Sequence, residues 1–380
     1  MAVYKIFPIK SATIYSEFPA VNTGRDEILE ISSYFKGTDS YVKRSLLSFD
    51  STEVSNVLES YVSSSTREAT DFSASLKLYL ASANEVPSSY TIQAFPVYIP
   101  EAQYVDWIAG NGKFGDLPVN SSGVSWAYTQ NSGSGGWTAD QISGETEYSY
   151  SGSVGGGQWY TETPGYVFDG SQAHTVASTH DLDVDVTQGV KAHYAGDIEN
   201  AGFILKLTGS LEFNAYTSSR QTHLRYFSGE THTIYPPSLE IKWDDSVDNT
   251  TLTEITDSNA VIKIKNNRGK YTDEGFQKFR LHVRPKFPVR TFSTSSSYLT
   301  NFVLPTASYW GIRDENTEDM VVDFDTTYTK ISRDNNGSYF TVHMGGLEPE
   351  RHYRILLKST IDDSTNVIDE DLVFKVVRNG

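Results

Sequence analysis

Three aspartates alternate with apolar residues in the segment Asp181-Leu182-Asp183-Val184-Asp185. Carboxylate oxygens are the ligands that Ca²⁺ prefers, but an EF-hand loop also needs a glycine and a downstream glutamate at set positions, which this segment lacks. Successive residues of a strand point to opposite faces, so the same pattern is typical of a strand with one solvated face. We expect such a strand here, with a structural calcium site or a subunit contact at Asp181, Asp183 and Asp185 as alternatives.

Aromatic residues that could stack on a sugar ring lie in the Gly- and Ser-rich stretch 107–165. Trp137 and Trp159 stand in glycine-rich settings, and Tyr160 follows the second tryptophan. An exposed aromatic platform would suit carbohydrate binding. Tryptophan is usually largely buried, so anchoring of the long loops, or a subunit contact, is the competing interpretation.

A cationic run extends from residue 263 to residue 290, and Asp273 and Glu274 are its only carboxylates. The residues predicted to form an interface are Lys263, Lys265, Arg268, Lys270, Arg280, Arg284, Lys286 and Arg290. The run matches no recognisable nucleic-acid-binding module, so nucleic acid is a disfavoured partner. It could be the solvated edge of two strands. We expect it to dock against an acidic partner, such as the acidic domain of a neighbouring copy, in a contact that builds a ring or a layered assembly.

The motifs of common enzyme classes are absent from the sequence. There is no cysteine, which excludes disulfides, thiolate metal sites and a cysteine nucleophile. The eight histidines have no zinc-site spacing, and there is neither a G-x-S-x-G elbow nor a phosphate-binding loop. We therefore expect no catalytic activity and no cofactor apart from the possible calcium ion.

The negative charge is concentrated in the first two thirds of the chain. Residues 1–250 hold 14 Lys/Arg and 30 Asp/Glu, a net charge of −16, whereas residues 251–380 hold 17 and 18, a net charge of −1. An acidic surface repels nucleic acid, whose binding depends on neutralising phosphates. The asymmetry predicts that the two ends of the chain contact different neighbours.

The composition predicts an all-β protein of two domains. The 380 residues include 24 Tyr, 19 Phe and 28 Gly, and alternating segments such as 75–80 and 279–283 are typical of strands. Trp126 and Trp243 lie in strand-like patterns and are predicted to be buried. We place a first domain at 1–245, a linker at 246–250 and a second domain at 251–380. No segment has the ~20 apolar residues of a membrane helix, and the first residues contain no signal-peptide pattern.

The first domain resembles the DNRLRE family of β-sandwich modules, which are related to jelly-roll carbohydrate-binding modules. The likeness covers roughly residues 5–245. It rests on the order ATIYS, N-x-G at Asn22–Gly24, L-x-I at Leu29–Ile31 and RSLLSFD at Arg44–Asp50, on a short helical turn at Gln188–Tyr194, and on PPSLEIKW near residue 240. The resemblance implies a jelly-roll-like sandwich that binds a ligand or forms part of an assembly. The Trp/Gly-rich middle departs from the family pattern.

The second domain resembles Ig/fibronectin III-like sandwiches. Its segment Gly346–Tyr353 is similar to the L-x-P-x-x-x-Y corner, in which the leucine plugs the core and the tyrosine hydroxyl bonds back to the backbone. The combination of the two domains, with passages such as LEIKWDDS and SYWGIRDE, resembles virion structural proteins of marine T4-like bacteriophages, including cyanophages.

This resemblance implies a non-enzymatic structural component of a tailed-phage virion, in the neck, tail or baseplate. Its partners would be other virion proteins and copies of itself, and it would be made in the host cytoplasm. The alternative is a carbohydrate-binding adhesin module that contacts host-surface glycans. An accessory module of a polysaccharide-degrading enzyme is a further alternative.

Overall fold

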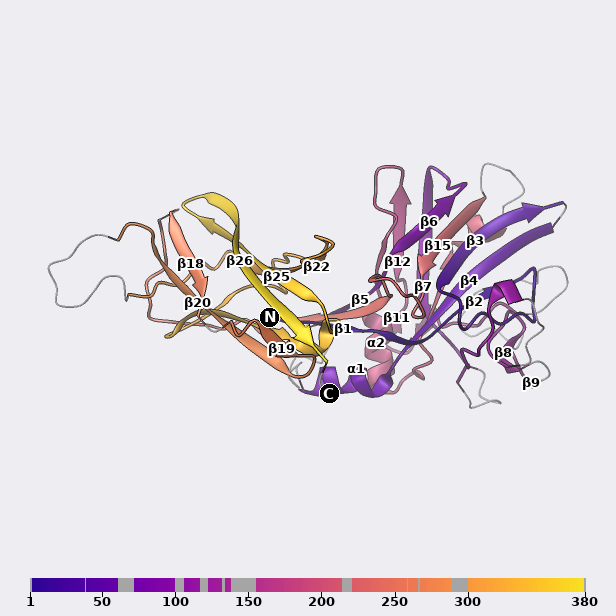
Figure 1. The fold of residues 1–380 in the computed structure, drawn as a ribbon. Coiled ribbons are helices and arrows are strands. Elements are labelled where there is room, and N and C mark those ends of the chain that lie inside the picture. Colours follow the sequence, from indigo (N-terminus) through magenta and orange to yellow (C-terminus); the bar gives the residue numbers. More distant parts are fainter. Residues whose placement is uncertain are drawn as a thin grey trace. The chain divides into compact units, whose positions relative to one another are not determined.

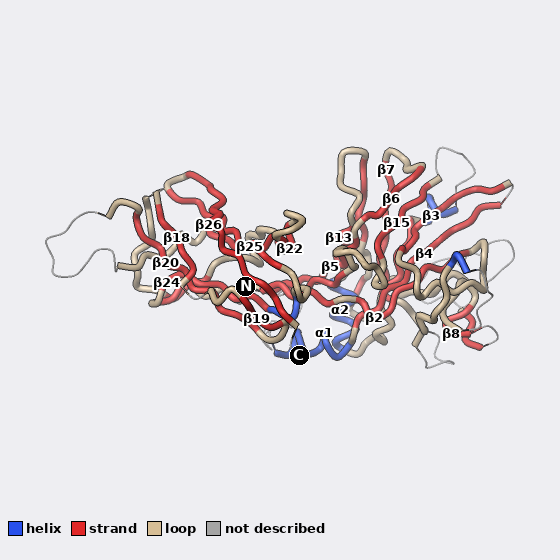
Figure 2. The backbone as a smooth tube through the Cα atoms, in the orientation of Figure 1, coloured by secondary structure: helices blue, strands red, loops and turns tan. Residues whose placement is uncertain are grey.

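The computed structural model confirms the predicted all-β sandwich fold, since strands far outweigh helices among the described residues (Figure 2). The structure describes residues 2–37, 39–60, 72–99, 106–116, 122–131, 134–137, 155–213, 221–257, 259–265, 267–288 and 300–378. The helical elements within these ranges are short: α1 (Ser51–Ser60), α2 (Thr187–Ala195), α3 (Gly209–Phe213) and the 3₁₀ turns Phe114–Asp116 and Met344–Gly346.

The chain divides into two compact units (Figure 1). The N-terminal unit comprises Ile6–Ala69 and Ser73–Glu240. The C-terminal unit comprises Ile241–Gly380 together with the short segments Met1–Lys5 and Thr70–Phe72. The C-terminal unit therefore begins a few residues earlier than the sequence suggests and includes the first residues of the chain.

The largest sheet of the N-terminal unit has eight strands in the order β12-β7-β14-β4-β3-β15-β6, with β2 also paired to β4. Their bounds are β2 (Pro8–Tyr15), β3 (Ile28–Lys36), β4 (Asp39–Phe49), β6 (Leu80–Asn84), β7 (Ser89–Pro96), β12 (Ser171–Thr175), β14 (Phe203–Leu207) and β15 (Thr222–Phe227). All five residues of β14 are buried, as expected for a strand between two neighbours. Ile14, Leu46 and Ile204 of this sheet form one core with Trp107 and Trp126.

The other described strands outside the C-terminal sandwich form smaller sheets. A four-stranded sheet has the order β1-β16-β5-β13, and two hairpins pair β10 with β11 and β8 with β9. Their bounds are β1 (Ala2–Ile6), β5 (Phe72–Leu78), β8 (Tyr128–Asn131), β9 (Ser134–Gly136), β10 (Glu162–Thr163), β11 (Tyr166–Val167), β13 (Leu182–Asp185) and β16 (Ser238–Trp243). The predicted helical turn at Gln188–Tyr194 lies within α2.

Two five-stranded sheets form the C-terminal sandwich. The first has the order β17 (Asp248–Asn249), β23 (Ser332–Asp334), β24 (Gly337–His343), β20 (Phe276–Pro285) and β18 (Ala260–Ile264). The second has the order β19 (Lys270–Thr272), β26 (Ser364–Val377), β25 (His352–Ile361), β21 (Ser308–Asp314) and β22 (Met320–Val322). Side chains of both sheets meet in one core, where the rings of Phe279 and Phe374 lie 5.7 Å apart.

The predicted corner of the second domain is confirmed. Leu347 is buried in the sandwich core, and the Tyr353 hydroxyl donates a 3.0 Å hydrogen bond to the carbonyl oxygen of Glu348. The buried ring and the backbone bond together fix the chain where it enters β25. Trp126 and Trp243 are also buried, as predicted.

Candidate interaction surface

The cationic run lies mainly on the outer face of the first C-terminal sheet. On β20, the buried Phe279, Leu281 and Val283 alternate with Lys278, Arg280, His282 and Arg284, which point away from the core. Lys263 on β18 is paired with His282, and the amide of Lys265 donates to the carbonyl oxygen of Arg280. We call Lys263, Lys265, Lys278, Arg280, Arg284 and Lys286 the basic face.

One member of the basic face is neutralised locally. The Arg280 guanidinium donates two hydrogen bonds, of 2.8 and 2.7 Å, to the carboxylate of Asp334 on β23. This contact lowers the pKa of Asp334. The Tyr339 ring of β24 lies beneath two cations, with the Lys278 ammonium 4.2 Å and the Arg280 guanidinium 5.1 Å from its centre. Arg280 and Lys278 are therefore held in place by the sheet that carries them.

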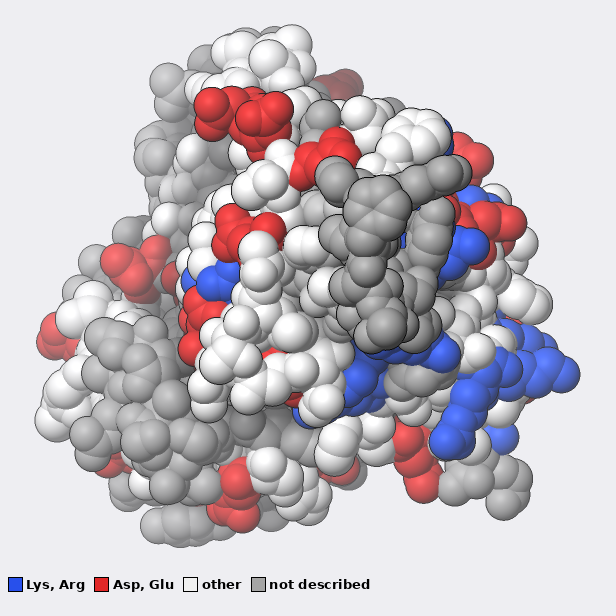
Figure 3. Space-filling view, turned by 90° about the vertical axis from the view of Figure 1, so that its left-hand side faces the viewer, with Lys and Arg blue, Asp and Glu red and all other residues white. Residues whose placement is uncertain are grey.

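His282 lies on β20 among the cations of the basic face. Partial burial lowers the pKa of His282, and the positive charges of Lys265 and Arg284 lower it further, against a hydrogen bond to Asn301 that raises it. Lys263, Lys265, Arg284 and Lys286 form no ion pair within the described part of the chain. Figure 3 looks from the side on which β18 and β20 lie in Figure 1, and blue Lys and Arg side chains gather at its lower right.

The structure separates the rest of the predicted run from this face. Arg268 is exposed in the loop between β18 and β19, and Lys270 belongs to β19, which pairs with β26 in the second sheet. Arg290 lies outside the described residues. The run is continuous in sequence, but the chain crosses between sheets at residues 265–270, so it does not form one surface.

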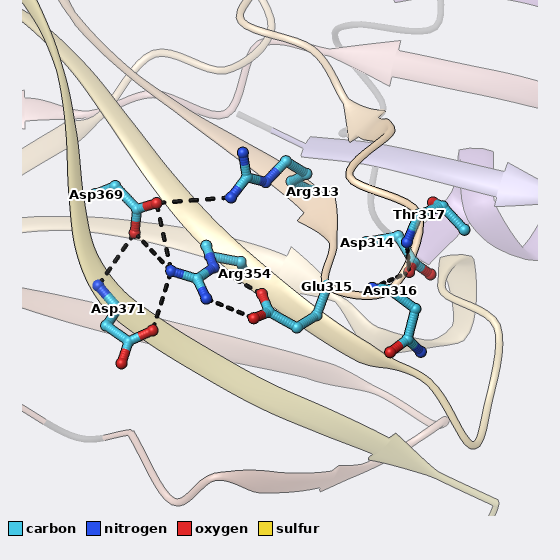
Figure 4. Close-up of polar contacts among 8 residues, drawn as sticks. All are labelled: Arg313, Asp314, Glu315, Asn316, Thr317, Arg354, Asp369 and Asp371. Carbon is cyan, nitrogen blue, oxygen red and sulfur yellow. Dashed lines mark hydrogen bonds and ion pairs between the residues drawn. The ribbon is translucent and has the colours of Figure 1, made fainter.

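The second sheet carries an ion-pair network that the sequence analysis did not identify (Figure 4). Arg354 of β25 contacts both carboxylate oxygens of Glu315 and also pairs with Asp369 and Asp371 of β26, at 3.2 and 3.0 Å. Arg313 of β21 lies 3.7 Å from Asp369. Three carboxylates share two arginines, so this network is not basic. Opposite charges at fixed spacing on neighbouring strands could have indicated it only if the strand register had been known.

The aspartates at 181–185 adopt the expected strand pattern. Leu182 and Val184 are buried, whereas Asp183 and Asp185 of β13 are exposed. The three carboxylates have separate partners: Asp181 accepts from the Leu80 amide, Asp185 accepts from the Thr187 amide, and Asp183 lies 3.7 Å from Lys77. In the part of the chain that the structure describes, no three acidic or histidine side chains are grouped as metal ligands would be.

The three aromatic residues predicted as a sugar platform lie in or against the core. Trp137 is 4% exposed and its indole N–H donates to the carbonyl oxygen of Ser125, so it offers no open ring face. Trp159 is half-buried, with the cationic groups of Arg44 and Lys206 at 5.0 and 5.2 Å from its ring. Tyr160 packs edge-on against Tyr98. The loop-anchoring interpretation therefore describes Trp137, and the platform prediction is wrong for this residue.

A buried charged triad of Arg44, Lys206 and Glu212 was also not predicted from the sequence. Arg44 of β4 donates two hydrogen bonds, of 3.1 and 2.9 Å, to Glu212 of α3, and Lys206 of β14 lies 3.5 Å from the same carboxylate. The exposed fraction of each of these side chains is 3% or less. The Arg44 guanidinium also lies 5.2 Å from the centre of the Trp126 ring. Since Arg44 and Glu212 are 168 residues apart, no local pattern marks the pair.

A cavity of about 220 Å³ opens beside the N-terminal end of α2. Asp169, Ser171, Asp185 and Gln188 contribute polar groups to its lining, and Phe168 is among its apolar residues. Such a lining can hydrogen-bond a small polar molecule.

No protein-family model matches the sequence, and no curated protein is significantly similar to it. Among the described residues, no helix is long and apolar enough to cross a membrane.

Proposed function

We propose that this chain is a non-enzymatic structural component of a tailed-bacteriophage virion, in the neck, tail or baseplate, and that it assembles through subunit contacts. The observation that supports this proposal best is the basic face. Its cations project from one sheet of a protein whose net charge is −17. Four of these cations have no ion-pair partner in the described part of the chain, which leaves them available to an acidic neighbour.

A surface of this kind favours a protein contact over a catalytic site. Complementary charge patches select partners and fix their register, which is what a component of a repeated assembly requires. The resemblance to DNRLRE-like and fibronectin-like modules of phage particles gives the context, and the proposed partners are other virion proteins and copies of this chain.

Mass spectrometry of purified particles tests the proposal. We expect the protein in the particles at a fixed copy number, and we expect Lys263→Glu/Lys265→Glu to reduce its incorporation. Lys270→Glu/Arg268→Glu is the matched control, because it makes the same charge change outside the basic face. Absence of the protein from washed particles would contradict a structural role.

Carbohydrate binding is the second candidate function, and the cavity beside α2 is the observation that favours it. Two carboxylates, an amide and a hydroxyl in its lining are groups that commonly bind sugar hydroxyls. A glycan array with the full chain, compared with Asp169→Ala and Gln188→Ala, tests this function. Retention of a bound glycan by the wild type and loss by both variants would support it.

A further inference from the structure

The net charge of −1 for residues 251–380 conceals two oppositely charged regions. Residues 259–288 hold eight Lys/Arg and two Asp/Glu, a net charge of +6. Residues 352–373, which include most of the β25–β26 hairpin, hold two Lys/Arg and five Asp/Glu, a net charge of −3. The basic face belongs to one sheet of the sandwich and the hairpin to the other. The basic face and the turn of the β25–β26 hairpin therefore carry opposite charges.

The turn of the β25–β26 hairpin is an exposed acidic tip. The strands pair as far as Ile361 and Ser364, so that Asp362 and Asp363 form a two-residue turn with φ values of 51° and 58°. The next four residues are exposed, and Val367 has 56% of its surface accessible. Asp362, Asp363 and Glu370 form no ion pair within the described residues. The name acidic tip is used for Asp362–Val367 together with Glu370, which lies farther along β26 between Asp369 and Asp371.

Protection of a sheet edge does not account for the basic face. Lysines on an edge strand commonly prevent pairing with another chain, and this explanation fits Lys263 on β18. Arg280 and Arg284 are on β20, however, which lies between β24 and β18 in the order of the sheet. The same face ends at Phe276, whose side chain is 64% exposed. Cations on an interior strand beside an exposed aromatic ring are typical of a contact surface.

We propose that copies of this chain make a head-to-tail contact, in which the acidic tip of one copy lies on the basic face of the next. This inference rests on the proposed function as an assembling protein and names the partner of the basic face. The carboxylates of Asp362, Asp363 and Glu370 pair with the ammonium and guanidinium groups of the basic face, and Val367 and Phe276 supply exposed apolar area. Because the two surfaces lie on different sheets, the contact is heterologous and generates a ring or a helical stack.

The network around Arg354 lies nearer the middle of the hairpin than its turn. Arg354 binds Asp369 and Asp371 at the bulged part of β26, where Asp371 has a φ of 58°. These ion pairs link β25 and β26 near the middle of the hairpin and do not involve Asp362 or Asp363. The carboxylates of the turn are thus left for a neighbour.

Zero-length carbodiimide cross-linking of the full chain at low ionic strength tests the contact directly. Equal amounts of ¹⁴N- and ¹⁵N-labelled protein identify the links that join two copies. We expect mixed-isotope links from Lys263, Lys265 or Lys286 to Asp362, Asp363 or Glu370, and we expect them to disappear at high salt, where charges are screened over a few ångströms. A wild-type protein that stays monomeric at low salt and forms no such link would overturn the proposal.

Two variants test which surfaces meet. The first, Lys263→Glu/Lys265→Glu/Lys286→Glu, brings the summed charge of the six basic-face positions from +6 to 0. The second, Asp362→Asn/Asp363→Asn/Glu370→Gln, removes the acidic tip while keeping residues that tolerate positive φ in the turn. Each variant alone should be monomeric by analytical ultracentrifugation, and their mixture should form only 1:1 dimers, since each supplies one intact surface.

The outcomes separate this inference from the proposed function. If the first variant is monomeric but the second still assembles, the basic face binds an acidic surface other than the tip, and the head-to-tail contact is wrong. Recovery of the protein in particles, measured by mass spectrometry, decides the virion role independently of either variant.

Discussion

Replacement of Arg44 by methionine should destabilise the N-terminal unit more than any exposed substitution. The guanidinium is 3% exposed, binds a carboxylate that is fully buried, and lies about 5 Å from the rings of Trp126 and Trp159. Removing one partner of a buried ion pair costs about 3–5 kcal/mol, because the remaining charge is left without compensation. Lys206 stays 3.5 Å from Glu212 and compensates part of that charge. We therefore expect a loss at the lower end, about 3 kcal/mol.

The assay is urea denaturation followed by tryptophan fluorescence, with calorimetry as a second probe. For a unit of more than 200 residues, a loss of about 3 kcal/mol corresponds to a melting temperature lower by about 6–12 °C. Arg25→Met is the matched control, since Arg25 is exposed in the same unit and should change stability by less than about 0.5 kcal/mol.

A multiple-mutant cycle separates the charge from the packing. The triple variant Arg44→Met/Lys206→Met/Glu212→Leu removes all three buried charges together. It should be more stable than Arg44→Met alone, because no unpaired charge remains in the core. A loss below about 1 kcal/mol for Arg44→Met, or a triple variant less stable than the sum of the single variants, would refute the assignment of this triad as a buried ion-pair network.

Three further predictions concern the rest of the fold. Burial lowers the pKa of His343 to about 4 and that of His193 to about 3, so both are neutral when folded and gain protons on unfolding. As the pH is lowered from about 6.5 to 4, the free energy of unfolding should therefore fall by about 1.4 kcal/mol per histidine for each pH unit. His343→Gln should reduce that slope in urea titrations at a series of pH values. Tyr353→Phe removes the bond to the backbone at Glu348 and should cost about 1 kcal/mol in a urea titration, with no change in circular dichroism. Arg354→Met should cost about 1 kcal/mol at low salt and less at high salt; a loss independent of salt would indicate that packing, not charge, is the main contribution of this residue.

Local patterns predicted the features that depend on a few neighbouring residues. The alternation at 279–283 and 182–185 identified strands and their buried faces, and the corner from Leu347 to Tyr353 was recognisable from its spacing. These features follow from the geometry of a single strand or turn. The expected α2 turn is of the same kind.

The remaining features depend on which distant segments pair. Arg44 meets Glu212 only because β4, β14 and α3 come together, and Trp137 is buried because its loop folds back onto Ser125 and the core. The cationic run is continuous in sequence. It is split because the chain leaves β18 for β19, which belongs to the opposite sheet. Such pairings are set by the whole fold, and the sequence carries no local sign of them.

The charge of an individual face of the sandwich also depends on the whole fold. The net charge of residues 251–380 suggested a nearly neutral domain, yet a sandwich assigns alternate residues to its two outer faces and its core, so a sum along the chain says nothing about any one face. Assigning each charge to its sheet gives cations on β18 and β20 and carboxylates at the β25–β26 turn. A neutral domain would not orient its neighbours. A domain with a cationic face and an acidic turn on different sheets would attract copies in one direction, which is the property that the proposed head-to-tail assembly needs.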